Sequence, residues 1–272
     1  TLADRTEGWA AALQLAALSL QGRDDPGAAV AKFAGDDRFI VDYLVDEVLD
    51  RLPADVRTFL LDTCILDRLT GPLCDAVTER SDGASVLREL ERANLFVVPL
   101  DDSRQWYRYH QLFADVLRSH LGREDPDRVA AVHRRAADWL WANGDSPGAI
   151  RHALAAQDFD RAAELMELTL PTMQRERAEA ELARWVQALP DEVVRVRPVI
   201  AVGLIGALAQ VSQFDEVGPR LAEIERQLCP DGQWAEHPPP ELIVIDEAGY
   251  RSVPASVAIF RQLGDKRGIA GA

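Results

Sequence analysis

The 272-residue sequence has little cysteine, little lysine and no long apolar run. Its three cysteines, Cys64, Cys74 and Cys229, form no CxxC pair and no ligand-spaced cluster with the five histidines. A sparse, odd-numbered set predicts neither a disulfide scaffold nor a structural metal, and it suits a reducing compartment. No stretch reaches the about 18 to 20 apolar residues of a membrane span, and residues 1–4 do not begin a signal peptide. We therefore expect a cytoplasmic protein without a metal.

The scarcity of lysine bears on nucleotide chemistry. Only two of the 30 basic residues are lysines, Lys32 and Lys266. A P-loop places a lysine directly after a glycine-rich turn, so that its ammonium reaches the β- and γ-phosphates of the nucleotide. Neither lysine follows such a turn, and the sequence has no HExxH motif and no catalytic Cys–His spacing. We expect no ATPase site in this chain, and we expect that the chain is not an enzyme.

The charge balance limits the partners that the chain can bind. Its formal net charge of −15 repels the phosphate backbone of nucleic acids and anionic membrane surfaces. Residues 37–122 carry 10 arginines against 16 acids, and they show no basic recognition helix. We therefore expect no direct nucleic acid contact and no membrane partner.

The first half of the chain combines helical patterns with one hairpin pattern. Apolar spacing predicts helices over 6–21, 39–52, 53–60, 70–77 and 81–93. Residues 95–100 read as a buried strand, 101–104 as a turn, 105–109 as the returning strand and 111–121 as a closing helix. Several helices followed by a hairpin and a helix is the element order of a winged-helix domain, which we place at residues 37–122.

The second half is predicted to be helical throughout. Helices are expected over 129–141 and 147–156, and another begins at 159. Small residues at their crossings, such as Ala136, Ala153 and Ala162, allow the backbones of stacked helix pairs to approach closely. We therefore interpret residues 123–272 as a tetratricopeptide-like α-superhelix. Residues 236–241 form a proline-rich break, and residues 257–272 contain the end of one helix and the start of the next, so the superhelix looks truncated.

One acidic pair in the second half has two interpretations. Asp246 and Glu247 follow the apolar run 242–245, and acids at the end of a strand can hold a metal ion. No third ligand is in view, however, and a solvated turn is the alternative. We expect no metal site.

Five long runs carry a resemblance to a known family. They are TEGWAAALQLA (6–16), FIVDYLVDEVL (39–49), ANLFVVPLD (93–101), WYRYHQLF (106–113) and AIRHALAA (149–156). In this order they resemble the MalT-type, large ATP-binding LuxR regulators. The resemblance implies a signal-transduction ATPase that switches between a closed ADP-bound monomer and an open ATP-bound oligomer. Such a protein has a P-loop domain, a helical part, a winged-helix domain, a superhelical sensor and a LuxR-type helix-turn-helix.

The resemblance assigns this chain to the middle of such a regulator. Residues 1–36 would be the end of the helical domain of the ATPase module, 37–122 the winged-helix domain and 123–272 the sensor. The overall class is mainly α. We expect no cofactor in this chain itself, with ATP or ADP bound in the full-length parent. The expected partners are the P-loop domain of the parent and a small-molecule or protein effector on the superhelix.

The resemblance also points to candidate nucleotide contacts. His110 stands at the junction of the hairpin and the closing helix, where related ATPases place a histidine against the β-phosphate of ADP. A helix N-terminus favours an anion at such a place. The alternative is a histidine that only hydrogen-bonds a backbone group. Gly8 and Ala10 are similar in position to a helix start that packs beside the adenine, and the alternative there is an ordinary apolar helix.

Three functional hypotheses remain open at this stage. The first is the switch-and-sensor portion of a MalT-type regulator, which couples effector binding to a nucleotide-dependent switch. The second is a free-standing tetratricopeptide-like scaffold for protein interactions. The third, a winged-helix DNA binder, is disfavoured by the acidic charge of residues 37–122.

Overall fold

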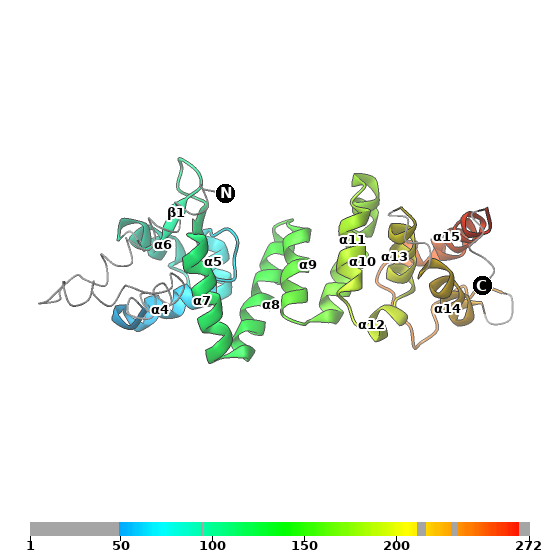
Figure 1. Cartoon of the computed structure of the whole chain (residues 1–272), viewed down its shortest axis with the longest axis horizontal. Coiled ribbons are helices and arrows are strands. Elements are labelled where there is room, and N and C mark those ends of the chain that lie inside the picture. Colours follow the sequence, from blue (N-terminus) through cyan, green and yellow to red (C-terminus); the bar gives the residue numbers. More distant parts are fainter. Residues whose placement is uncertain (1–48, 94, 211–215, 230–232, 267–272) are drawn as a thin grey trace, which may run out of the picture. The chain divides into compact units, whose positions relative to one another are not determined.

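A computed structural model describes residues 49–93, 95–210, 216–229 and 233–266 (Figure 1). Gly8, Ala10 and the predicted helix over 6–21 lie outside the described residues, as does most of the predicted helix over 39–52. The chain divides into two compact units, residues 1–139 and 140–272. The described residues are mostly helical, which confirms the mainly α class.

The first unit follows the predicted winged-helix order. Its elements are α4 (Ala54–Thr63), α5 (Gly71–Thr78), α6 (Gly83–Arg92), β1 (Val97–Pro99), β2 (Tyr107–Tyr109), α7 (Gln111–Glu124) and the first part of α8 (Pro126–Ala142). The core contains large, fully buried side chains from several of these elements, among them Phe59, Leu87, Tyr107 and Phe113. The expected order of helices, hairpin and closing helix is therefore confirmed.

Two glycines allow α5 and α6 to pack closely. A Cβ atom at Gly71 would lie 2.7 Å from the Cβ of Ala84, and one at Gly83 would lie 2.8 Å from the carbonyl oxygen of Gly71. Both distances are shorter than packed atoms tolerate. The Asp75 carboxylate on α5 accepts a hydrogen bond from the Gly83 amide at 2.7 Å and so satisfies the first turn of α6.

The hairpin is shorter than the sequence predicts. Val97 pairs with Tyr109 and Pro99 with Tyr107 in an antiparallel register. Phe96 has a φ of 57°, outside the β region, so the strand begins at Val97 and not at residue 95. The stretch before α5 adds a bridge that the sequence did not reveal: Leu69 and Tyr107 exchange backbone hydrogen bonds of 2.7 and 2.9 Å.

The second unit is a succession of packed helices. After the end of α8 come α9 (Ser146–Ala155), α10 (Phe159–Glu176), α11 (Glu179–Gln187), α12 (Asp191–Arg195), α13 (Pro198–Gln210), α14 (Val217–Leu228) and α15 (Glu247–Lys266). Ala149, Ala153, Ala162 and Ala163 are all buried where α9 packs against α10, as stacked helices require. The helical class of this unit is confirmed, while its tetratricopeptide likeness stays a prediction.

Two expectations concern the last part of the second unit. Helix α15 is described as far as Lys266, which lies within the range 257–272 where a helix end was expected, and the expected start of a further helix falls on residues 267–272, which lie outside the described part. Residues 242–245 form no strand, so the idea of a metal at a strand end loses its structural basis. The amide of Ile243 donates to the Val196 carbonyl at 2.7 Å. This bond ties the segment before α15 to the end of α12.

Within the described residues, no group of three or more His, Cys, Asp or Glu side chains is placed to hold a metal ion. None of the helices described is both long enough and apolar enough to cross a membrane.

Candidate functional site

The first candidate site is the junction between β2 and α7, where His110 lies. Its backbone has a φ of −58° and a ψ of 133°, and it stands directly before the first residue of α7. The His110 amide donates to the Phe96 carbonyl at 2.8 Å, and the His110 carbonyl accepts from the Ala114 amide at 3.0 Å. These bonds fix the main chain of the junction, so that the imidazole side chain is not needed to hold it.

Aromatic side chains surround the junction. The ring centroids of Phe96 and Phe113 lie 4.8 Å apart, and those of Tyr109 and Phe113 lie 6.0 Å apart. The Tyr109 hydroxyl hydrogen-bonds the Thr63 hydroxyl at 2.7 Å. Burial raises the pKa of Tyr109 well above its ordinary value, so this phenol stays protonated. The hairpin and α7 are thus held to α4 by a packed, largely apolar cluster.

The ring of His110 retains one unused polar atom. Nδ1 is buried and has no hydrogen-bond partner among the described residues. A buried polar atom of this kind calls for a partner from outside the described protein groups, such as a water or a ligand. It lies beside the N-terminus of α7, whose free amides favour an anion. The role of His110 toward a nucleotide nevertheless stays a prediction, as do those of Gly8 and Ala10, which lie outside the described residues.

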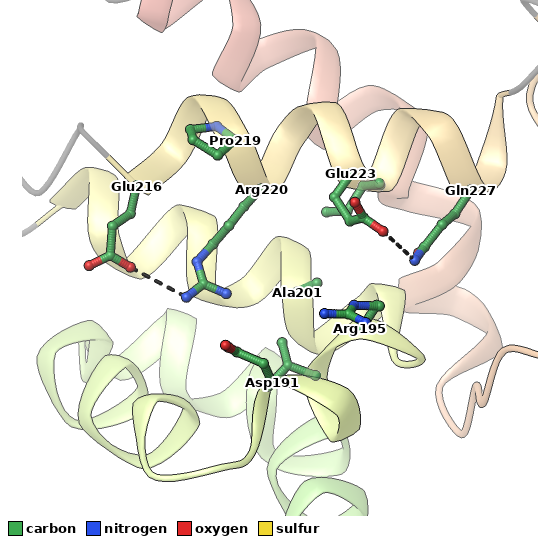
Figure 2. Close-up of a pocket in the computed structure, with 10 residues that line it drawn as sticks. Asp191, Arg195, Ala201, Glu216, Pro219, Arg220, Glu223 and Gln227 are labelled. Atoms are coloured by element: carbon green, nitrogen blue, oxygen red, sulfur yellow. Dashed lines mark hydrogen bonds and ion pairs between the residues drawn. The ribbon is translucent and has the colours of Figure 1, made fainter.

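The second candidate site is a pocket of about 370 Å³ in the second unit. It lies between α12, α13 and α14 (Figure 2). Its lining residues are Asp191, Val194, Arg195, Ala201, Glu216, Pro219, Arg220, Glu223, Ile224 and Gln227. The volume falls in the range of small-ligand pockets, about 300 to 1,000 Å³.

We call the lining side chains from Glu216 to Gln227 the α14 wall of this pocket. Its charged side chains pair with one another or with a neighbouring amide. The Arg220 guanidinium donates to the Glu216 carboxylate at 3.3 Å, and the Gln227 amide donates to the Glu223 carboxylate at 3.0 Å (Figure 2). The α12 wall differs. Asp191 and Arg195 are exposed and have no hydrogen-bond or ion-pair partner among the residues that the structure describes. No pattern in the sequence predicted this pocket.

A further pocket, of about 420 Å³, lies between α15 and the segment that joins α14 to α15. Trp234 and His237 line it from that segment, and Tyr250 and Arg251 line it from α15. The Tyr250 hydroxyl donates to the Ala235 carbonyl at 3.3 Å, which ties the segment to α15. Burial raises the pKa of Tyr250, and its hydroxyl therefore remains a donor at neutral pH.

Two buried charged side chains organise the second unit. Glu167 on α10 is 0% exposed, and its Oε1 accepts from the amides of Ile245 and Asp246 at 2.8 and 2.9 Å. Arg197, before α13, is 4% exposed and donates to Asp160 at 3.0 Å. Burying such groups is costly unless they are hydrogen-bonded. These contacts join α10 to the start of α13 and to the start of α15, but Glu167 Oε2 and Arg197 Nε and Nη1 are buried without a partner among the described residues.

Residues 144–148, with the sequence GDSPG, have the GxSxG spacing of a hydrolase nucleophile elbow, a pattern that the sequence analysis overlooked. That motif needs a strand before the serine and a helix after it. Here the residues join α8 to α9, and the Asp145 carboxylate accepts from the Gly148 amide at 2.9 Å as a helix cap. The spacing therefore belongs to a turn between two helices.

A family model described as the MalT winged helix domain matches residues 45–129. The serine/threonine-protein kinase PknK of Mycobacterium tuberculosis is 38% identical over 211 residues, which are 77% of this chain and 19% of that protein. The HTH-type transcriptional regulator MalT of Klebsiella pneumoniae is 34% identical over 238 residues, 87% of this chain and 26% of the relative. MalT of Yersinia enterocolitica is 34% identical over 261 residues, 95% of this chain and 28% of the relative.

The chain thus spans between 19% and 28% of the length of these relatives. The match of the family model ends at residue 129, and the compact units divide after residue 139. The predicted boundary between the winged-helix domain and the superhelix, at residues 122 and 123, stays a prediction.

Proposed function

The chain belongs to the MalT-type regulators over the region that it spans, and from this premise we propose that it couples effector binding to a nucleotide-dependent switch. In this proposal the winged-helix unit responds to the nucleotide of the parent protein. The helical unit receives a small-molecule or protein effector. The chain itself performs no catalysis, binds no DNA and acts in the cytoplasm.

The observation that carries the proposal is the range of proteins that share this segment. One relative is named a serine/threonine-protein kinase and others are named transcriptional regulators, although each matches most of this chain. The matched segment is a minor share of every one of them. A segment common to proteins with different outputs is better explained as a regulatory part than as the output itself.

The geometry of the His110 junction supports the nucleotide side of the proposal. A phosphate oxygen accepts hydrogen bonds, and His110 Nδ1, when it carries the proton, is a donor without a partner among the described residues. The neighbouring N-terminus of α7 adds partial positive charge. The residues therefore fit one phosphate contact from ADP or ATP. The remaining contacts would come from the P-loop domain of the parent.

The pocket between α12, α13 and α14 supports the sensor side. It is concave, it combines apolar and charged side chains, and it lies in the helical unit, separate from the His110 junction. Effector sites commonly have this composition.

The test is a substitution in a full-length regulator that contains this segment. His110→Ala should weaken ADP retention and raise basal transcription, because the closed state loses a phosphate contact. His110→Gln, which keeps a side-chain amide donor, should restore part of both. The matched control is His120→Ala, on α7, the helix that follows His110; the His120 ring contacts Arg57 at 3.1 Å. If His110→Ala leaves ADP retention and basal output unchanged, the proposed switch role is wrong.

The second candidate function, a free-standing interaction scaffold, is favoured by the surface of α15. Ile259 and Leu263 are 57% and 41% exposed and stand one turn apart on that helix. Such an apolar pair can bind a partner helix. This candidate predicts that the 272-residue chain is a stable monomer and binds its protein partner without any nucleotide.

A further inference from the structure

The α12 wall of the pocket in Figure 2 carries one acid and one arginine that do not pair. Asp191 and Arg195 are four residues apart on a helix, a spacing at which an acid and an arginine usually pair. Here they do not pair with each other or with any other residue that the structure describes. In Figure 2 the Asp191 carboxylate turns toward the side of Arg220, while Arg195 lies beside Ala201.

The opposite wall does not neutralise these charges. Glu216 and Arg220 pair along α14 at 3.3 Å, and the Glu223 carboxylate accepts from Gln227 at 3.0 Å. The pocket therefore offers two unused groups of opposite sign, both from α12. Three acids and two arginines line the pocket, a sum of −1, so a ligand with a net negative charge is disfavoured.

Between the two charges the pocket is apolar. Val194 and Ile224, 5% and 2% exposed, are already buried beneath it, and the exposed Pro219 and half-buried Ala201 supply the apolar surface that a ligand can reach. A ligand that covers Pro219 and Ala201 gains from removing apolar surface from water. The ligand body that fits is therefore apolar and carries its charges at its ends.

We propose that this pocket binds a zwitterionic ligand, a free α-amino acid or a short apolar peptide. Its ammonium group pairs with Asp191 and its carboxylate pairs with Arg195, while its side chains lie against Pro219 and Ala201. The assignment rests on the proposed function, since this ligand would be the effector of the sensor unit. A neutral ligand would leave both α12 charges without a partner.

The probe is the dipeptide leucyl-leucine, titrated into the 272-residue chain by calorimetry and by NMR. Free leucine is measured beside it. The matched probes are N-acetyl-leucyl-leucine, which has no ammonium group, and leucyl-leucinamide, which has no carboxylate. Each capped probe should bind about three- to tenfold more weakly than the dipeptide, because each loses one partly exposed ion pair.

Two variants test which group of the ligand each of these side chains binds. Asp191→Asn should abolish the preference for the free amine, and Arg195→Gln should abolish the preference for the free carboxylate. Both side chains are exposed, so the fold tolerates the changes. The matched control is Arg184→Gln, whose partner is Glu181 on the surface of α11 and which lies in neither of the two pockets described. It should bind all four probes as the parent does.

The zwitterion assignment is overturned if neither leucine nor the dipeptide binds, or if the capped probes bind equally well. It is also overturned if binding persists unchanged in both α12 variants. The outcome is separable from the proposed function. Suppose that Asp191→Asn changes the effector response of a full-length regulator while the 272-residue chain binds no zwitterion. The proposed sensor role would then stand, and only the assignment of a zwitterionic ligand would be wrong.

Discussion

Removing the Glu167 carboxylate tests how the last described helix is fixed. Glu167 lies on α10, is fully buried, and accepts two backbone hydrogen bonds of 2.8 and 2.9 Å from residues 245 and 246. These residues directly precede α15, so the carboxylate satisfies amides at the start of a helix nearly eighty positions further along the chain. The variants to compare are Glu167→Ala and Glu167→Gln.

The expected loss follows from the number and kind of bonds. A hydrogen bond to a charged group contributes about 1.5 to 3 kcal/mol, so two give an upper limit of about 3 to 6 kcal/mol. Water replaces part of this, because Ile245 is 41% exposed and its segment can be solvated once released. We expect Glu167→Ala to lower the free energy of unfolding by about 2 to 4 kcal/mol. Glu167→Gln keeps an acceptor oxygen and should cost about 1 to 2 kcal/mol.

The assay is urea unfolding combined with amide hydrogen exchange. The exchange of the residue 245 and 246 amides should accelerate more than that of α9. The matched control is Glu164→Ala on the same helix, where a part-exposed pair with Arg161 at 2.9 Å is lost, and its cost should stay below about 0.5 kcal/mol. Glu167→Ala with control-like stability and unchanged exchange at those two amides would refute the reasoning.

Three further predictions concern the first unit. Gly71→Ala should destabilise the chain by about 1 to 3 kcal/mol in urea unfolding, since its new methyl meets Ala84 at 2.7 Å. Gly122→Ala, where nothing lies within 4 Å, should be neutral or stabilising, and equal effects would contradict the packing argument. Burial raises the pKa of the Cys64 thiol to about 12, so iodoacetamide at pH 8 should modify it only after unfolding; rapid labelling of the folded chain would count against this. Burial, aided by a nearby arginine, lowers the pKa of His133 below its ordinary 6.5. The unfolded chain therefore binds a proton at His133 more tightly than the folded chain does. The stability contributed by neutral His133 is present above pH 6.5 and should be lost as the pH falls through the folded-state pKa of His133. His133→Gln should flatten this part of the stability profile, and an unchanged profile would be inconsistent with the assignment.

Local signals in the sequence were sufficient for most of the helices. Thr70 was expected to begin a helix, and its hydroxyl accepts from the Leu73 amide at 3.3 Å as a cap. A helix was expected to begin at residue 159, and Asp158, directly before it, caps α10 in the same way. Caps of this kind depend on residues only three positions apart, so the sequence displays them directly.

Features that depend on distant residues could not be predicted. Phe96 adopts a positive φ, which is uncommon for a residue other than glycine, and no local pattern announced it. The partner of Glu167 lies 78 positions away and consists of backbone amides, which carry no sequence signal. The Figure 2 pocket is assembled from α12, α13 and α14, and its function depends on charges that fail to pair, which only the three-dimensional arrangement shows.

The central claim is that this segment holds the switch contact and the sensor, while the nucleotide-hydrolysing centre belongs to other parts of a larger regulator. The most direct measurement is equilibrium ATP and ADP binding by the purified 272-residue chain, together with its rate of phosphate release. The account predicts no tight nucleotide binding and no turnover, because in the proposed role this segment offers the nucleotide a phosphate contact through His110 and no P-loop lysine. Tight ATP capture with measurable hydrolysis would contradict it.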